Sequence, residues 1–259
     1  MFGKSRPARG EPRGPKGQRA YVVGDIHGRL DLLEHLLADI HLDLARRPVA
    51  KALLVFLGDL IDRGPSSSEV VERLRTYRHA GVRPIYILGN HEEVLLRVIA
   101  GETELIAKWC WFGGKECLRS YGVDPASLAA LGPDGELAAI RQAIPSEHVE
   151  FLRSFVDTCR FGDYLFVHAG VRPGVGLDQQ RPSDLRWIRE PFLLSDNDYG
   201  FMVVHGHSIS PEVDERTNRI GIDTGAYRTG RLTALAIEED RRWYLDTATA
   251  PESAVSVTH

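Results

Sequence analysis

The stretch Gly58-Asp59-Leu60-Ile61-Asp62-Arg63-Gly64 decides how this sequence is interpreted. It follows the apolar run 52–57, which predicts a buried strand that ends at Gly58. Asp59 would then lie at the carboxyl end of a strand, the edge at which α/β folds place their chemistry. Two carboxylates and a guanidinium so close together indicate a site for a divalent cation and a phosphate, which would satisfy all three charges. An acidic turn with Arg63 paired to Asp62 explains this stretch alone equally well.

The same order of strand, polar loop and helix occurs on both sides of this stretch. Residues 19–23 predict a strand that runs into Gly24-Asp25-Ile26-His27-Gly28, after which apolar residues recur at helical spacing over 30–40. Residues 84–88 predict a third strand, followed by Gly89-Asn90-His91-Glu92 and another helix. This alternation predicts neighbouring strands whose loops meet at one edge of a sheet. The residues that would meet there are Asp25, His27, Asp59, Asp62, Asn90 and His91.

Asp25 and His27 also have a simpler interpretation. Residues two apart point the same way, so an oxygen and an imidazole ligand would lie together. An Asp that caps a helix, next to an incidental His, explains this motif alone about as well.

The rest of the chain predicts a helical insert and a second sheet. Residues 101–160 have short helical patterns and an apolar cluster of Trp109, Trp111 and Phe112, without obvious chemistry. Residues 163–167 predict a strand that ends at His168-Ala169-Gly170, and residues 201–204 predict another that ends at His205-Gly206-His207. Further strands are expected over 219–222, 232–237 and 243–245, several of them antiparallel. These elements predict one α/β catalytic domain over 19–247.

The charge of the chain is unevenly distributed. The whole sequence has a net charge of −4, and residues 1–19 contribute +5 (six basic side chains and one Glu), which leaves −4 − 5 = −9 for the remainder. An acidic body disfavours nucleic-acid binding, which requires clustered Lys and Arg. Residues 1–18 are expected to be a disordered basic arm, favoured as a solvated tail over a docking arm for an acidic partner, and 248–259 a flexible tail.

Cysteine use and hydropathy indicate the compartment. Cys110, Cys117 and Cys159 have no paired spacing, which favours reduced thiols over a zinc site or disulfides. Neither a membrane-spanning run nor the hydrophobic core of a signal peptide is present, so we expect a cytoplasmic protein without a membrane partner.

The residues at the expected strand ends have the composition of a metal centre. They are Asp25, His27, Asp59, Asn90, His168 and either His205 or His207. Imidazoles mixed with carboxylates favour borderline ions such as manganese, iron or zinc over magnesium or calcium alone. The set is too large for one ion and suits a bridged pair about 3.5–4 Å apart, as in two-metal hydrolases. Any one of these residues alone would more often be structural.

In order and spacing, five motifs resemble the signatures of the phosphoprotein phosphatases. These motifs are Gly-Asp-Ile-His-Gly at 24–28, Gly-Asp-Leu-Ile-Asp-Arg-Gly at 58–64, Gly-Asn-His-Glu at 89–92, His-Ala-Gly at 168–170 and Gly-His at 206–207. That family includes calcineurin and the bacterial and phage Ser/Thr phosphatases. The resemblance, which covers about 21–245, implies the calcineurin-like metallophosphoesterase fold, a two-sheet β-sandwich flanked by helices with the metal site at the strand carboxyl ends.

The resemblance also implies a role for each matching residue. Asp25, His27 and Asp59 would hold one ion, and Asp59, Asn90, His168 and His207 the second, with manganese favoured for both. His91, oriented by Asp62, would protonate the leaving oxygen while a metal-bound hydroxide attacks. Arg63 and Asn90 would contact the substrate phosphate. Arg189 resembles a second phosphate ligand of the bacterial form, although an ordinary surface arginine is nearly as good an explanation.

Two departures qualify the resemblance: the weak match at Arg189, described above, and the motif around His207. The wider superfamily has a Gly-His-x-His motif, whose second His is absent from Gly206-His207-Ser208-Ile209, as it is from the protein phosphatases. Tyr227 is a candidate for the mouth of the site.

Three functions remain open at this stage. The first is removal of phosphate from phosphoserine or phosphothreonine in a phosphoprotein substrate. The second is hydrolysis of symmetrical dinucleoside polyphosphates by enzymes that look similar but generally lack the Asp found here as Asp62. The third is a catalytically silent scaffold, although no expected ligand or catalytic residue is missing.

Overall fold

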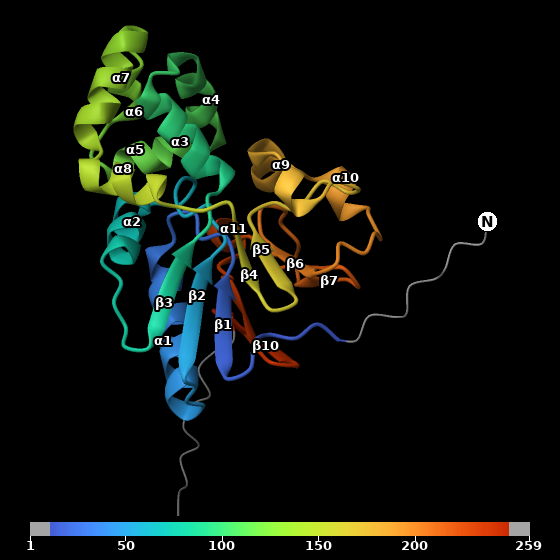
Figure 1. The fold of residues 1–259 in the computed structure, drawn as a ribbon. Helices are drawn as coiled ribbons and strands as arrows, with labels where there is room; N and C mark the ends of the chain where they lie inside the picture. The colour runs from blue at the N-terminus through green and yellow to red at the C-terminus, as the bar shows by residue number, and fades with distance from the viewer. Residues whose placement is uncertain (1–10, 249–259) are drawn as a thin grey trace, which may run out of the picture.

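Two five-stranded sheets, with helices on their outer faces, form the body of the chain in a computed structural model that describes residues 11–248 (Figure 1). The first sheet has the order β10-β9-β1-β2-β3, in which β1, β2 and β3 are parallel and β9 and β10 antiparallel. Its strands are β1 (Gln18–Val23), β2 (Lys51–Phe56), β3 (Val82–Tyr86), β9 (Thr233–Glu238) and β10 (Arg241–Asp246).

The second sheet has the order β4-β5-β6-β8-β7, with β5, β6 and β8 parallel and the two edge strands antiparallel. Its strands are β4 (Thr158–Phe161), β5 (Tyr164–Val167), β6 (Met202–His205), β7 (Asp214–Glu215) and β8 (Arg219–Gly221). Both sheets are therefore mixed, and in each the three parallel strands direct their carboxyl ends toward one edge.

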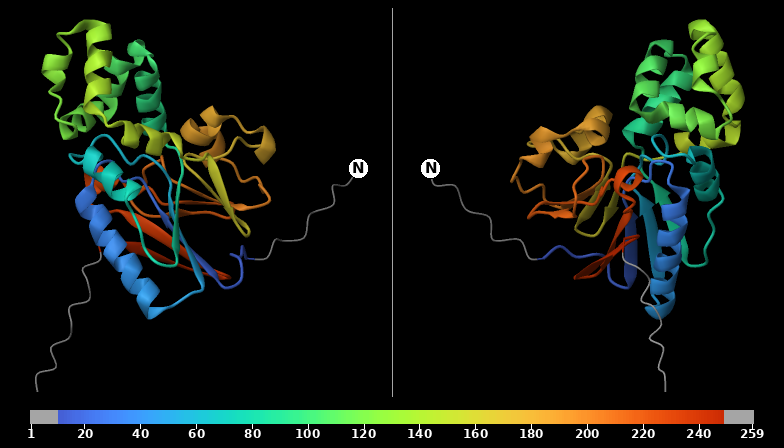
Figure 2. Two further views of the ribbon diagram at one scale, coloured as in Figure 1. Left: turned by 60° about the vertical axis from the view of Figure 1, so that its left-hand side comes forward. Right: turned by 180° about the vertical axis from the view of Figure 1, so that it is seen from behind.

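Helices surround this pair of sheets (Figure 2). Three follow the parallel strands of the first sheet: α1 (Leu30–Arg46), α2 (Ser67–Arg75) and α3 (Asn90–Ala100). The insert continues from α3 as η1 (Thr103–Leu105), α4 (Ile106–Trp109), the π-turn η2 (Cys110–Gly114), α5 (Lys115–Ser120), α6 (Pro125–Leu128), α7 (Gly132–Ala143) and α8 (Ser146–Arg153). The chain then forms η3 (Leu177–Gln179), α9 (Pro182–Trp187), α10 (Glu190–Leu193) and α11 (Ala226–Thr229).

Alternation along the strands explains the layers. In β1, Ala20 and Val22 face the second sheet, whereas Tyr21 and Val23 face the core formed with the helices. In β5, Phe166 joins the inter-sheet core and Leu165 the core beneath α9 and α10. Because successive side chains point to opposite faces, strands that are apolar throughout bury both faces. The two-sheet α/β fold expected from the sequence is thereby confirmed.

Some boundaries differ from those expected. Helix α3 begins at Asn90, so Asn90 and His91 belong to its first turn and not to a preceding loop. The end of the expected insert, 158–160, belongs to strand β4, which pairs with β5. The apolar cluster predicted in the insert is wrong: Trp109 is buried, but Trp111 and Phe112 are 83% and 51% exposed.

The segment 11–17 contacts both sheets, so the expectation of an arm without fixed contacts over 1–18 is wrong for these residues. The Gly14 amide donates to the Glu239 carbonyl in the β9–β10 turn at 2.7 Å. The Arg13 amide donates to Asp163 at 2.9 Å, between β4 and β5, and the Arg13 carbonyl accepts from the Asp163 amide. Residues 1–10, and 249–259 of the expected C-terminal tail, lie outside the described residues.

None of the helices within 11–248 is long and apolar enough to cross a membrane. Cys110, Cys117 and Cys159 are free thiols, as expected.

Candidate metal centre and active site

The six predicted metal ligands all lie at the carboxyl-end edge of the sheets and are buried. Asp25 and His27 follow β1, Asp59 follows β2, and Asn90 follows β3. The second sheet contributes His168 after β5 and His207 after β6. Their exposed fractions range from 0% for His168 to 7% for Asn90 and His207. The packing of the two sheets therefore brings together residues that are far apart in the sequence.

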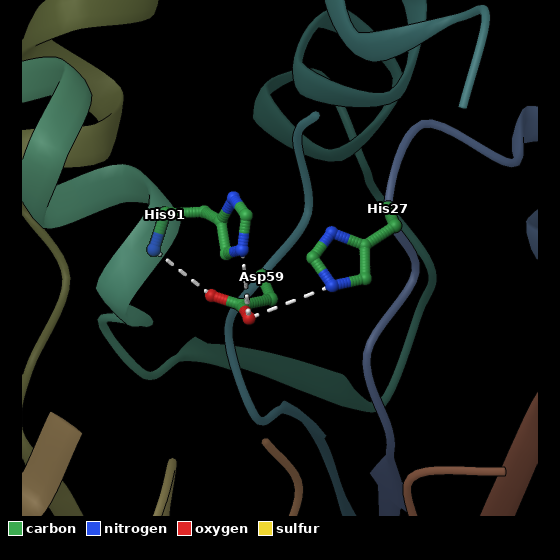
Figure 3. Close-up of side chains that lie close together, drawn as sticks. All are labelled: His27, Asp59 and His91. Atoms are coloured by element: carbon green, nitrogen blue, oxygen red, sulfur yellow. Dashed lines mark hydrogen bonds and ion pairs between the residues drawn. The ribbon is translucent and has the colours of Figure 1, made fainter. Parts of the chain in front are cut away.

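Asp59 is shared by two groups of potential ligands. One group contains His27, Asp59 and His91, and the other contains Asp59, His168 and His207. Figure 3 shows Asp59 between the imidazoles of His27 and His91. Its Oδ2 is 3.6 Å from His27 Nε2 and 3.9 Å from His91 Nε2, and its Oδ1 is 3.4 Å from His168 Nε2. A carboxylate with one oxygen toward each group has the geometry of a bridging ligand.

Backbone carbonyls fix the ring orientation of two of these histidines. His27 Nδ1 is 2.8 Å from the Ile61 carbonyl, and His168 Nδ1 is 2.8 Å from the Leu57 carbonyl. A carbonyl can only accept, so each Nδ1 carries the proton and each Nε2 presents a lone pair toward Asp59. This is the arrangement by which proteins prepare histidine as a metal ligand.

Asn90 lies between two histidines in a way that a cation would explain. Its Oδ1 is 2.9 Å from His168 Nε2 and 2.8 Å from His207 Nδ1. Because His168 Nε2 is unprotonated, it and the Asn90 oxygen are two acceptors facing each other, which is unfavourable unless a positive ion lies between them. His207 Nε2 is buried and has no hydrogen-bond partner within residues 11–248. The donor set thus fits a transition ion.

The predicted ligand Asp25 belongs to neither of these two groups, but it lies beside them at the same edge of the sheet. Its carboxylate accepts from the His207 amide at 3.0 and 3.2 Å. Burial raises the pKa of Asp25 well above its usual value, and the charges of Asp223 and Asp59 raise it further. A bound cation would relieve this concentration of buried negative charge.

The histidines are held neutral, which is the form that binds metal. Burial lowers the pKa of His27 well below its usual value. Burial also lowers the pKa of His168, and that of His207 to about 2. The pKa of Asp59 is lowered although its burial alone would raise it, so this carboxylate is ionised among the imidazoles. Neutral imidazoles around an ionised carboxylate match the requirements of a transition-metal site.

The backbone is strained at these residues. The described part of the chain has six non-glycine residues with positive φ: His27, Asp59, Asp62, Arg63, His207 and Glu239. All but Glu239 are candidate site residues. Such conformations cost about 1–3 kcal/mol each and persist where the surroundings impose them, typically at functional sites.

His91 and Asp62 form a buried pair beside the metal ligands. His91 Nδ1 is 2.6 Å from Asp62 Oδ2, and the two residues are 4% and 0% exposed. Burial opposes the charged imidazolium, but the charges of Asp59 and Asp62 outweigh it and raise the pKa of His91. The pair is therefore arranged to keep a proton on an imidazole in the site.

Arg63 lies next to both groups and against Tyr227. Its guanidinium nitrogens are 2.9 Å from His27 Nε2 and 3.1 Å from His91 Nε2. The guanidinium carbon stacks 4.8 Å from the centre of the Tyr227 ring, which also contacts His27 edge-on. Tyr227 thus lies beside the site, as the sequence suggested.

A pocket of about 320 Å³ opens above these residues. Arg63, Asn90, His91 and His207 line its floor, and the predicted Arg189 lines it too, where it donates to Ser208 at 3.2 Å. The walls come from the insert, α3 and α9, with the side chains of Val94, Arg97, Leu105, Lys108, Trp109, Phe112 and Trp187. By contrast, His205 is buried beneath the second sheet's helices against Phe192, away from this pocket.

Sequence reasoning missed three residues of the site. Glu92 is fully buried and accepts from the amides of Asp59 at 2.8 Å and Leu60 at 2.7 Å, which holds the bridging residue's loop. Asp223 follows β8 at the same edge, so the strand-end rule that found the other ligands could have found it. Trp109 donates from Nε1 to both oxygens of Asp62, at 3.0 and 3.1 Å, and no sequence signal indicated this contact.

A model of the calcineurin-like phosphoesterase family matches residues 19–234. The chain belongs to this family. With the His and Asp groups described above, it is a metal-binding hydrolase of the metallophosphoesterase type. The second sheet and the site geometry agree with this assignment.

Known relatives have two kinds of name. The chain is 26% identical to the asymmetrical bis(5'-nucleosyl)-tetraphosphatase of Bacillus subtilis, over 90% of this chain and 94% of the relative. It is 29% identical to serine/threonine-protein phosphatase 1 of Salmonella typhimurium, over 85% of this chain and 93% of the relative. A solved structure described as a putative diadenosine tetraphosphatase has the same fold, with a TM-score of 0.60 and 22% identity over 89% of this chain and 94% of that one.

Proposed function

We propose that this protein removes phosphate from phosphoserine or phosphothreonine side chains of proteins, with two divalent ions in the site. The observation that carries the proposal is the 2.6 Å contact between His91, which lines the pocket, and the buried Asp62 beneath it. An ester of serine or threonine has an alkoxide leaving group of high pKa, so its cleavage needs a well-oriented acid.

The residues that would hold the ions are those at the strand ends. Asp25, His27 and Asp59 would hold one, and Asp59, Asn90, His168 and His207 the other. Such ions, when bound, neutralise phosphate charge and activate water for attack. Manganese is the favoured ion, with iron and zinc as alternatives that the same donors accept.

The chain's own residues then bind the ester and supply a proton. Arg63 is positioned to hold the phosphate through a planar guanidinium, with Arg189 across the pocket and the amide of Asn90 nearby. His91 lines the pocket, and once Arg63 turns from His91 Nε2 to the phosphate, Nε2 would donate a proton to the leaving oxygen, since Asp62 holds Nδ1. Positioned proton transfer of this kind contributes about 10²- to 10⁴-fold to the rate.

The size of the pocket supports a small reacting group. A pocket of about 320 Å³ is near the lower end of ligand pockets and has room for a phosphorylated side chain. A protein substrate would place the phosphorylated residue in the pocket and the rest of its chain outside.

A parallel assay tests this proposal. Wild type and the Asp62→Ala variant would be compared on a phosphothreonine peptide and on diadenosine tetraphosphate, with added manganese. We expect a higher kcat/KM on the peptide, and a much larger loss on the peptide than on the dinucleotide in the variant. A polyphosphate leaving group is already a stable anion and needs little protonation. Equal losses, or a higher wild-type kcat/KM on the dinucleotide, would contradict the proposal.

A second candidate function is hydrolysis of dinucleoside polyphosphates, which the exposed aromatic and cationic side chains of the pocket wall favour. Phe112 and Trp187 are 51% and 39% exposed at this pocket, near Lys108, Arg97 and Arg189. Aromatic rings beside cationic side chains suit a base and a phosphate chain. The names of two similar proteins point the same way, and the assay above separates the two candidates.

A further inference from the structure

We propose that the turn Trp109–Gly114 of the helical insert is the positioning element of the active site. In this proposal Trp109 holds Asp62 in the orientation that aligns His91, and Gly113 holds the backbone of Arg63. The inference rests on the proposed roles of His91 and Arg63. It gives the insert a task at the reaction centre in addition to lining the pocket.

The first contact of the turn is with the carboxylate of the acid pair. Asp62 is inaccessible to solvent, and the indole of Trp109 donates to both of its oxygens. His91 contacts one of the same oxygens. An indole N–H only donates, so it cannot replace His91 as the proton carrier. Its effect is to fix the rotation of the carboxylate and, through it, the imidazole.

The second contact is with the backbone of the phosphate-binding arginine. The Arg63 amide donates to the Gly113 carbonyl at 3.0 Å. Gly113 has φ of +116°, and a Cβ there would lie 2.6 Å from Arg63 Cγ and 2.7 Å from its amide nitrogen. The close approach of the two backbones therefore requires glycine at position 113.

Strain in the contacted residues explains why a positioning element is needed. Asp62 and Arg63 are consecutive residues with φ of +72° and +66°. Left-handed conformations of non-glycine residues persist only where the surroundings impose them. The turn meets both residues, the first through its side chain and the second through its amide.

Substitution Trp109→Phe tests the first contact, because it keeps an aromatic ring and removes the N–H together with one ring of the indole; the leaving-group dependence separates the lost hydrogen bond from the lost packing. We expect kcat on an alkyl phosphate to fall roughly tenfold, the equivalent of one hydrogen bond to a charged group. An aryl phosphate with a good leaving group should lose much less, and KM and metal content should not change. Trp111→Phe is the matched control, since Trp111 is 83% exposed on the same turn, and it should behave as wild type.

Substitution Gly113→Ala tests the second contact. Displacing Arg63 should raise KM severalfold for alkyl and aryl phosphates alike, because the phosphate is common to both. The control is Gly122→Ala: Gly122 also has positive φ, +79°, but a Cβ there would meet nothing within 4 Å. This variant also places Ala at positive φ, but without the contact with Arg63, and should leave kinetics unchanged.

The outcomes separate this inference from the proposed function. If Asp62→Asn shows the leaving-group-dependent loss while Trp109→Phe and Gly113→Ala match their controls, the positioning role is wrong and the proposed function stands. Loss of metal, or a loss in Trp109→Phe that is equal for alkyl and aryl esters, would likewise overturn it in favour of a general structural role. If wild type hydrolyses no phosphate monoester, the proposed function fails and this inference with it.

Discussion

At the scale of single residues, the site is set by what each ring nitrogen and carboxylate oxygen contacts. His27 and His168 each use Nδ1 to hold a backbone carbonyl, which leaves Nε2 to face Asp59. His91 uses Nδ1 to hold Asp62, a carboxylate. A neutral carbonyl partner thus makes His27 and His168 suitable as metal ligands. The charged partner Asp62 instead makes His91 suitable as an acid.

Replacing Asp59 should affect both ion sites, since one oxygen faces each group. We expect Asp59→Asn to reduce the bound manganese from two ions toward none, whereas His27→Ala should weaken mainly one site. Elemental analysis after reconstitution and gel filtration measures the stoichiometry. Wild type that retains one ion or none would contradict the two-metal proposal.

Replacing His91 should show whether this residue is a general acid or a metal ligand. Both roles are open because His91 lies in one group with His27 and Asp59. We expect His91→Asn to lower turnover by roughly 10²- to 10⁴-fold with metal content unchanged, and to affect alkyl phosphates more than aryl phosphates. Loss of an ion in this variant would instead make His91 a ligand.

The residues that sequence could predict are those that directly follow a strand. Asp25, Asp59 and His168 stand where an apolar run ends, so the pattern alone places them at the sheet edge. Glu92 and Trp109 act through contacts with residues 33 and 47 positions away, and no local pattern encodes such contacts. The left-handed backbone conformation of Asp62 and Arg63 could not be predicted from the sequence either, because nothing in their side chains requires it.

At the scale of elements, the pocket lies between the helical insert and α9. The Trp187 indole of α9 donates to Glu93 of α3 at 3.0 Å, and Arg186 pairs with the same carboxylate. On its other side, α9 is tied to the loop after His168, where Arg172 pairs with Asp184 at 2.6 Å. The position of α9 therefore depends on ion pairs at both of its faces.

The Arg172–Asp184 pair should make stability depend on pH in a defined direction. Hydrogen bonds from Arg172 lower the pKa of Asp184 below its usual 3.8. A carboxylate with a depressed folded-state pKa stabilises the fold above its unfolded pKa, and this stabilisation is lost as pH falls through the folded value. The Tm of wild type should therefore exceed that of Asp184→Asn at pH 6. This Tm difference should vanish at low pH.

Thermal unfolding of wild type, Asp184→Asn, Arg172→Gln and the double variant from pH 6 to pH 3 measures this effect. The double variant should be no less stable than Asp184→Asn if the pair accounts for the difference. A Tm difference that is constant across the range would exclude the ionised pair as its cause.

Element types were more predictable than their ends. The strand and helix periods of 18–100 are strong, and the three strands and the helices after the first and third of them occur as expected. The start of α3 was placed late because Asn90 and His91 look like loop residues, although Glu92 caps this turn by accepting from the Gly89 amide at 3.1 Å. Strand β4 was missed because Thr158–Phe161 is short and lies at a sheet edge.

At the scale of the whole molecule, the site requires both sheets to be in register. Asp59 comes from the first sheet, whereas His168 and His207 come from the second. The inter-sheet core, with Val22 and Val55 on one side and Phe166 and Val204 on the other, fixes their relative positions. A contact that joins the two sheets therefore stabilises the site indirectly. The segment 11–17 makes such contacts at the ends of the strands that lie away from the site.

Removal of this segment should lower stability without changing chemistry. A chain that begins at Gln18 loses the Gly14 bond to Glu239, the two bonds of the Arg13 backbone to Asp163 and the Tyr164 hydroxyl bond to the Pro12 carbonyl. Each such bond contributes about 0.5–1.5 kcal/mol, and ordering seven residues offsets part of the sum. Relative to a chain that begins at Glu11, we expect Tm to fall by roughly 2–6 °C in calorimetry.

Turnover on a small aryl phosphate should be the same for both chains, because β1 separates the segment from Asp25 by six strand residues, about 20 Å. Gly14→Val gives the same test in the full chain, since a Cβ at this position would lie 2.8 Å from Phe161 Cε1. It should lower Tm and leave turnover unchanged. Equal Tm values would mean that the contacts of 11–17 add nothing to the joining of the sheets. A fall in turnover at unchanged metal content would mean that the register of the sheets reaches the site from their far ends.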